Sequence, residues 1–110
     1  MGTLIYDSTD GYDFDDMVLA HLQSVITAKL RRKEAFLLTW MDRTSSPSGT
    51  LRSIWLTEHL SVQFVFSGPS LPRVNRDWVA VMARKANSNV GLRLEDDLRA
   101  TIRAANTDAS

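Results

Sequence analysis

The chain contains no cysteine. This absence excludes disulfide bonds, a thiolate nucleophile and a cysteine-ligated metal centre, and it fits a reducing compartment. No apolar run approaches the roughly 20 residues that a membrane-spanning helix needs. The sequence also does not open on a basic segment followed by an apolar stretch, the pattern of a secretory signal. We therefore expect a soluble, cytoplasmic protein with no membrane partner.

Glycine and proline are few, 5 and 3 among 110 residues, and the chain has no internal repeats or low-complexity tracts. A chain of this length forms one domain and buries enough surface for a core without disulfides or metals. Hydrophobic residues make up 44% and charged residues 24%, as in ordinary globular proteins. Composition thus predicts a small single domain and leaves its function open.

Apolar spacing predicts two main helices. Asp13 is the expected N-cap of the first, after a turn at Asp10-Gly11, and basic residues at its end complement the helix dipole. Asn75 is the expected N-cap of the second, whose buried stripe includes Trp78. A narrow stripe of apolar residues predicts an extra C-terminal helix at residues 96–105.

Strand signals complete a small α+β domain of order β-α-β-β-β-α-β. Short connections favour antiparallel neighbours, so we expect a mostly antiparallel sheet packed against two helices. The strands are expected at residues 3–7, 35–41, 51–57, 62–66 and 92–94. Residues 1–94 form the domain, and residues 95–110 form a helical extension with a frayed tail.

The strands at 35–41 and 51–57 are apolar on both faces. If Asp42 lies opposite Thr50, Phe36, Leu38 and Trp40 share the face that the helices cover. Two helices cannot cover the other face as well, and an exposed apolar patch usually has a partner. The side chains expected on that face are Leu37, Met41, Leu51 and Trp55.

Two occupants compete for this exposed face. A second copy of the chain can bind there, because a net charge of zero puts little repulsion between copies. Alternatively, the C-terminal helix folds back and covers the face with Leu98 and Ile102. The sequence leaves the oligomeric state and the docking of this helix open.

The zero net charge conceals a segregated distribution. The first sixteen residues carry five aspartates and no Lys or Arg, whereas residues 29–93 hold eleven Lys and Arg against four acidic residues. Such asymmetry is a hint about partners. Basic side chains around the two helices form a candidate nucleic-acid surface: Arg31, Arg32, Lys33, Arg73, Arg76, Arg84 and Lys85. The neutral total and the absence of phosphate-binding glycine motifs count against it.

No motif supports a catalytic residue, a metal ligand set or a cofactor site. The aspartates lack the spacing and the terminal Glu of a calcium loop. His21 and His59 provide no metal-ligand spacing, and no serine nucleophile motif accompanies them. We therefore assign no catalytic, metal or cofactor site, and binding of a cation by the aspartate cluster stays open.

Several segments together resemble a family of short bacterial proteins of unknown function, over roughly residues 1–94. The segments are Met1-Gly-Thr-Leu-Ile-Tyr-Asp7, Asp13-Phe-Asp-Asp16, Phe36-Leu-Leu-Thr-Trp40, Ser53-Ile-Trp-Leu56 and Asn75-Arg-Asp-Trp-Val79. Some members carry an automatic label of ATP-dependent DNA ligase. That label implies a K-x-D-G motif, but Ser8 stands two residues before Asp10-Gly11 in this chain. The resemblance thus implies at most an accessory role near DNA metabolism.

We therefore expect a non-catalytic interaction module that associates with itself, or with another protein, through the exposed sheet face. The alternative is a nucleic-acid-binding accessory protein in DNA repair or ligation.

Overall fold

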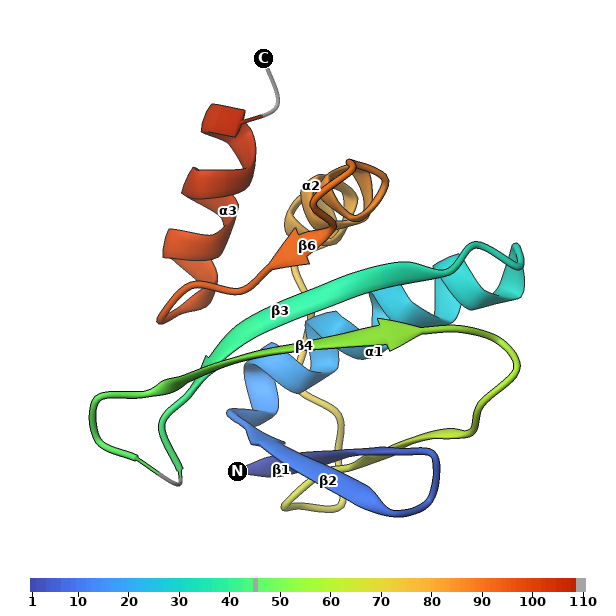
Figure 1. Ribbon diagram of the computed structural model, residues 1–110, viewed down its shortest axis with the longest axis vertical. Coiled ribbons are helices and arrows are strands. Elements are labelled where there is room, and N and C mark those ends of the chain that lie inside the picture. The colour runs from blue at the N-terminus through green and yellow to red at the C-terminus, as the bar shows by residue number, and fades with distance from the viewer. Residues whose placement is uncertain (45, 109–110) are drawn as a thin grey trace.

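The computed structural model describes residues 1–44 and 46–108, which form two three-stranded sheets and three helices (Figure 1). The elements are β1 (Gly2–Tyr6), β2 (Asp10–Phe14), α1 (Asp16–Arg31), β3 (Phe36–Asp42), β4 (Thr50–Leu56), β5 (Val62–Val65), α2 (Arg76–Ala86), β6 (Leu92–Arg93) and α3 (Leu98–Asp108). The α+β class, the predicted order and the C-terminal helix are confirmed, and β2 is an additional strand.

Strand β2 replaces the predicted turn and helix start. It pairs antiparallel with β1, and the chain reverses at Asp7 and Ser8, whose φ angles are 59° and 62°. Asp13 lies within β2, where it accepts a hydrogen bond from the Thr3 hydroxyl (2.9 Å), so the predicted N-cap is wrong. The alternation of Tyr12 and Phe14 explains the strand, because both side chains then turn toward the core.

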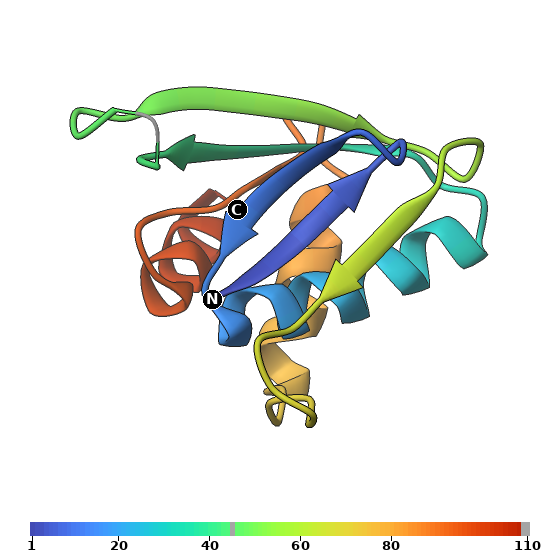
Figure 2. The ribbon, with the colours of Figure 1, turned by 90° about the horizontal axis from the view of Figure 1, so that it is seen from below.

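The predicted single sheet is divided into two. Strand β5 pairs antiparallel with β1, giving the order β2-β1-β5, whereas we expected it beside β4. The second sheet has the order β4-β3-β6, with β6 parallel to β3. Figure 2 shows the three strands β2, β1 and β5 crossing in front of α1, with β3 and β4 along the top.

The predicted register of the β3–β4 hairpin is confirmed. Asp42 lies opposite Thr50 and Phe36 opposite Leu56. Phe36, Leu38 and Trp40 are buried, as expected for the face turned toward the helices. The edge of the Tyr12 ring meets the Trp40 ring at a centroid distance of 5.1 Å, which joins the two sheets through their inner faces.

Helices α1 and α2 lie side by side and run in the same direction. Near the start of α2, the Asn75 amide donates to Nε2 of His21 (3.0 Å), and near its end Lys29 donates to the side chain of Asn87. Asn75 is the N-cap of α2, as predicted, and its side chain accepts from two amides of the first turn. Helix α1 thus contacts both ends of α2 through two buried polar side chains.

Helix α3 packs on α2 rather than on the exposed face of the β4-β3-β6 sheet. Its stripe residues Leu98 and Ile102 are buried with the core, and Figure 1 shows α3 standing beside α2, away from β4. The alternative in which this helix covers the sheet face is therefore wrong. Trp78 is only half-buried, less than its predicted place in the core implied.

Candidate protein-interaction face

The side of the β4-β3-β6 sheet that faces away from the helices carries the four predicted apolar residues. Strand alternation places Leu37, Met41, Leu51 and Trp55 together there, and we call this group the outer face. Trp55 is 58% exposed, Leu51 54% and Met41 37%, while Leu37 is half-buried. The sequence analysis identified all four because the register that it assumed, with Asp42 opposite Thr50, is the one in the structure.

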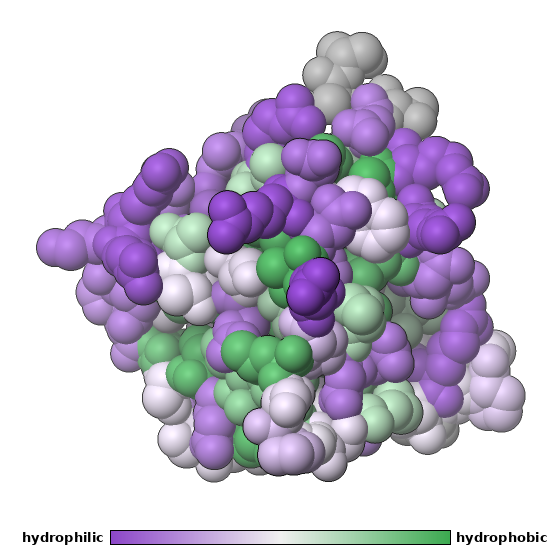
Figure 3. Space-filling view, turned by 180° about the vertical axis from the view of Figure 1, so that it is seen from behind, coloured by the Kyte–Doolittle hydropathy of each residue, from purple (hydrophilic) through white to green (hydrophobic). Residues whose placement is uncertain are grey.

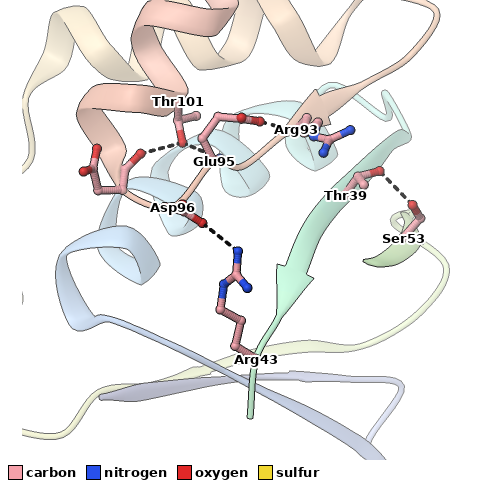
Figure 4. Close-up of polar contacts among 8 residues, drawn as sticks. Thr39, Arg43, Ser53, Arg93, Glu95, Asp96 and Thr101 are labelled. Carbon is pink, nitrogen blue, oxygen red and sulfur yellow. Dashed lines mark hydrogen bonds and ion pairs between the residues drawn. The ribbon is translucent and has the colours of Figure 1, made fainter. Parts of the chain in front are cut away.

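A polar pair divides the outer face into two apolar halves. The Thr39 and Ser53 hydroxyls lie 2.8 Å apart and hydrogen-bond each other (Figure 4). Leu37 and Trp55 lie on one side of this pair, and Met41 and Leu51 on the other. Because each hydroxyl has a partner within the chain, covering the outer face leaves no orphaned polar group at its centre.

The backbone beneath the most exposed residue is held in place. The Tyr6 hydroxyl donates a hydrogen bond to the carbonyl oxygen of Trp55. Burial raises the pKa of Tyr6 above its ordinary value, so the hydroxyl remains a donor throughout the neutral range. This contact fixes the strand while the indole ring projects outward.

The seven predicted basic residues fall into two groups around the parallel helix pair. Arg31, Arg32 and Lys33 follow the end of α1, and Arg84 and Lys85 lie near the end of α2, so both sets share one end of the molecule. These cations complement the negative ends of two helix dipoles. Arg73 and Arg76 lie at the other end of α2, about 12 Å away by helical rise.

The aspartates of the N-terminal segment are distributed over several structural roles. Asp13 lies in β2, Asp15 immediately precedes α1 without a side-chain capping bond, and Asp16 accepts hydrogen bonds from Ser67. Over residues 1–44 and 46–108, no group of three or more His, Asp or Glu side chains is arranged to hold a metal ion.

An acidic cleft of about 410 Å³ lies between the ends of β2 and β3 and the loop before α3. Its charged lining comprises Asp13, Asp15, Asp42, Glu95, Asp96 and Arg43. Arg43 lies 3.4 Å from a carboxylate oxygen of Asp96 (Figure 4). The sequence analysis did not find this cleft, because its lining comes from distant segments of the chain.

Asp42 is the most perturbed carboxylate of this cleft. Hydrogen bonds from the side chain and amide of Thr44, together with the Arg52 guanidinium at 2.6 Å, lower its pKa to about 2. These bonds favour the ionised form and leave it little basicity. Asp42 is therefore a structural anion at the end of the hairpin rather than a proton acceptor.

A second hollow, of about 450 Å³, lies between the C-terminal half of α1 and β5. Apolar side chains line it: Leu30 from α1, Val62 and Phe64 from β5, and Leu60 from the loop before β5. We call it the α1–β5 groove. On the back of the molecule, Figure 3 shows hydrophobic surface framed by hydrophilic side chains. Sequence reasoning missed the groove because it had placed β5 beside β4.

The two histidines differ completely in their surroundings. His21 is 1% exposed; its Nδ1 donates to the Met17 carbonyl oxygen (2.8 Å), which leaves Nε2 to accept from the Asn75 amide. His59 lies exposed in the loop between β4 and β5. His21 therefore serves the junction of two helices.

Helix length and sequence comparisons add the remaining observations. No helix within the described part of the chain is long and apolar enough to cross a membrane. No curated protein and no solved structure matches the chain. The family model described as "Domain of unknown function (DUF7882)" matches residues 1–97, which include both sheets, α1 and α2. The chain therefore belongs to this family of domains of unknown function.

Proposed function

We propose that the chain is a non-catalytic interaction module whose outer face binds a second copy of the same chain. The observation that carries this proposal is the exposure of Trp55, Leu51 and Met41 together on the side of the β4-β3-β6 sheet that no helix of the described residues covers. Apolar surface gathered in this way usually belongs to an interface.

The magnitude allows a weak, reversible dimer. The outer face offers roughly 300 Å² of apolar surface per copy, the lower end of the largest patches on monomers. Burying two such faces at about 25 cal/mol per Å² contributes about 15 kcal/mol. Loss of translational and rotational freedom costs about 4–15 kcal/mol, so we expect a concentration-dependent dimer.

Sedimentation of the full chain over a range of concentrations tests this proposal. The wild-type protein should shift from monomer to dimer, and Trp55→Glu should remain monomeric because it places a charge within the apolar interface. Leu71→Glu is the matched control: Leu71 is 62% exposed but lies in the loop before α2. A wild-type monomer at every concentration, or equal loss of dimer in both variants, would contradict the proposal.

A second candidate function is nucleic-acid binding by the basic residues. Arg76 and Arg84 are eight positions apart and share one exposed side of α2, and neither side chain has a partner among the described residues. Arg73 is also exposed and lies two residues before the N-cap of α2. Phosphate contacts of this kind give affinity that falls steeply with salt.

An electrophoretic shift with mixed-sequence DNA and RNA at low and high salt tests the second candidate. A shift that high salt abolishes, and that Arg76→Gln combined with Arg84→Gln weakens, favours nucleic-acid binding. Arg99→Gln, on the exposed side of α3, is the control for a general loss of positive charge. Absence of any shift at low salt would reject this candidate.

A further inference from the structure

Strand β5 forms an edge of its sheet and carries none of the features that usually protect an edge strand from pairing with another chain. In the order β2-β1-β5, β5 pairs only with β1 among the described strands. The opposite edge strand, β2, carries Asp10 and Asp13, which discourage pairing with another chain. The β5 sequence is Val-Gln-Phe-Val, with neither a charge nor a proline. The β2 edge is therefore protected against pairing with another chain, whereas the β5 edge is open to it.

Every second residue of an edge strand directs its amide and carbonyl away from the sheet. An extended peptide can satisfy these groups by pairing as a fourth strand, a mode of recognition that other domains use beside a helix. Figure 2 shows β5 at the side of its sheet, with the C-terminal half of α1 extending beyond it. The open edge thus lies next to a helix.

The α1–β5 groove lies along this same edge. Ile26 and Leu30 contribute from α1, and Val62 and Phe64 contribute from β5. Val62 and Phe64 are alternate residues that share the inner side of the sheet, as their pairing opposite Tyr6 and Leu4 shows. A strand added to β5 would turn every second side chain into this apolar groove.

Charges at one end of the groove indicate a polarity for the occupant. Arg31 lines the groove where β5 begins, and Arg32 and Lys33 follow it at the end of α1. Glu58 also lines this end, so the local balance is positive but small. Among the described residues the guanidinium of Arg31 has no hydrogen-bond or ion-pair partner, which leaves it available to a carboxylate.

We propose that the α1–β5 groove binds an extended segment of a partner protein, which pairs antiparallel to β5 as a fourth strand. Two apolar side chains at alternate positions of the segment enter the groove. An acidic residue follows them toward the C-terminus of the segment and meets Arg31, because an antiparallel strand runs from Val65 toward Val62. This site is separate from the outer face, and neither proposal depends on the other.

Selection of random octapeptides displayed on phage, with the full chain as bait, tests the proposal. The enriched peptides should share two apolar residues at alternate positions followed by Asp or Glu. The strongest peptide is then synthesised, and its affinity is measured by titration calorimetry. The same affinity for wild-type protein and for Trp55→Glu would show that the outer face takes no part.

A matched pair of variants on α1 locates the binding site. Thr27 and Ala28 are both exposed on α1, but only Thr27 lines the groove. Thr27→Glu should weaken binding of the acidic peptide about tenfold or more, and Ala28→Glu should change it less than about twofold. Arg31→Gln should remove the preference for Asp or Glu while leaving the apolar preference in place.

A modified peptide tests strand pairing itself. N-methylation of the amides that pair with β5 removes their donors without removing side chains, and should weaken binding about tenfold. The proposal is overturned if no peptide is enriched, if Thr27→Glu and Ala28→Glu behave alike, or if N-methylation at successive positions has no effect. It is equally overturned if Trp55→Glu dimerises through β5, because a second copy would then occupy the edge.

Discussion

The buried contact between His21 and the start of α2 leads to the most direct prediction. His21 Nε2 is the acceptor for the Asn75 amide, the first backbone donor of the α2 cap. Replacing His21 with Leu keeps an apolar side chain of similar size but removes this acceptor. An amide left without a partner costs about 1–3 kcal/mol.

The expected loss lies in the lower part of this range. Asn75 is an exposed residue, so water can replace part of the missing hydrogen bond. Loss of the hydrogen bond from the imidazole to Met17 costs little, because the Met17 carbonyl oxygen also accepts a hydrogen bond from the backbone amide of the following helical turn. We therefore expect His21→Leu to lower the free energy of unfolding by about 1–2 kcal/mol, which moves the urea midpoint by about 1 M.

His21→Gln provides the rescue variant. The Gln side chain can place a carbonyl oxygen close to the position of Nε2 and accept the Asn75 amide again, so more than half of the lost stability should return. His59→Leu is the control for histidine replacement in general, because His59 is exposed. It should leave the urea midpoint unchanged.

Urea unfolding at pH 7.5, followed by circular dichroism, measures all three variants against wild type. If His21→Leu were as stable as wild type, or if His21→Gln were less stable than His21→Leu, the Asn75 amide would not depend on this acceptor. The account of how α1 holds the start of α2 would then be wrong.

Three further predictions concern a residue pair, a carboxylate and a glycine. Lys29→Met combined with Asn87→Ala in a double-mutant cycle should show a coupling of about 1 kcal/mol or more in urea unfolding; additive losses would refute a direct contact. Because the pKa of Asp42 is lowered to about 2, its contribution to stability is present above pH 4 and lost as the pH falls toward 2. In Asp42→Asn the free energy of unfolding should thus fall less steeply as the pH is lowered from 4 toward 2. The same steepness as in wild type would contradict this. Gly91→Ala should cost more than about 2 kcal/mol, because φ is +76° and a Cβ would meet the β3 backbone, whereas Gly68→Ala, with no neighbour within 4 Å, should be nearly neutral in thermal melts.

Local pattern predicted the parts of the molecule in which the relevant partners are close in sequence. The β3–β4 hairpin is one such part: its connection is short, and the pairing of Asp42 with Thr50 assigned every side chain of β3 and β4 to a face. The cap of α2 is another, because Asn75 contacts amides two and three residues ahead. The sequence therefore predicted which residues share the outer face.

Strand β2 shows how a local signal can have two meanings. Asp13 in an Asp-rich segment before an apolar helix fits an N-cap, and the same residue fits an exposed strand position between Tyr12 and Phe14. The Tyr12 ring contacts Trp40, which is distant in sequence, and this contact favours the strand. Burial of two aromatic side chains outweighs one capping hydrogen bond of about 1 kcal/mol.

The sequence by itself determined the α+β class, the two main helices and, with Asp42 set opposite Thr50, the residues of the outer face, because hydrophobic periodicity and short connections act within a few residues. Tertiary structure decided that β5 pairs with β1, which opened the groove beside α1, and that α3 packs on α2, which left the outer face exposed. An apolar strand can pair with any suitable edge, and its choice depends on which arrangement buries the most surface over the whole chain. That competition is settled by contacts between segments far apart in sequence, such as Tyr6 with Val62, and no local pattern records it.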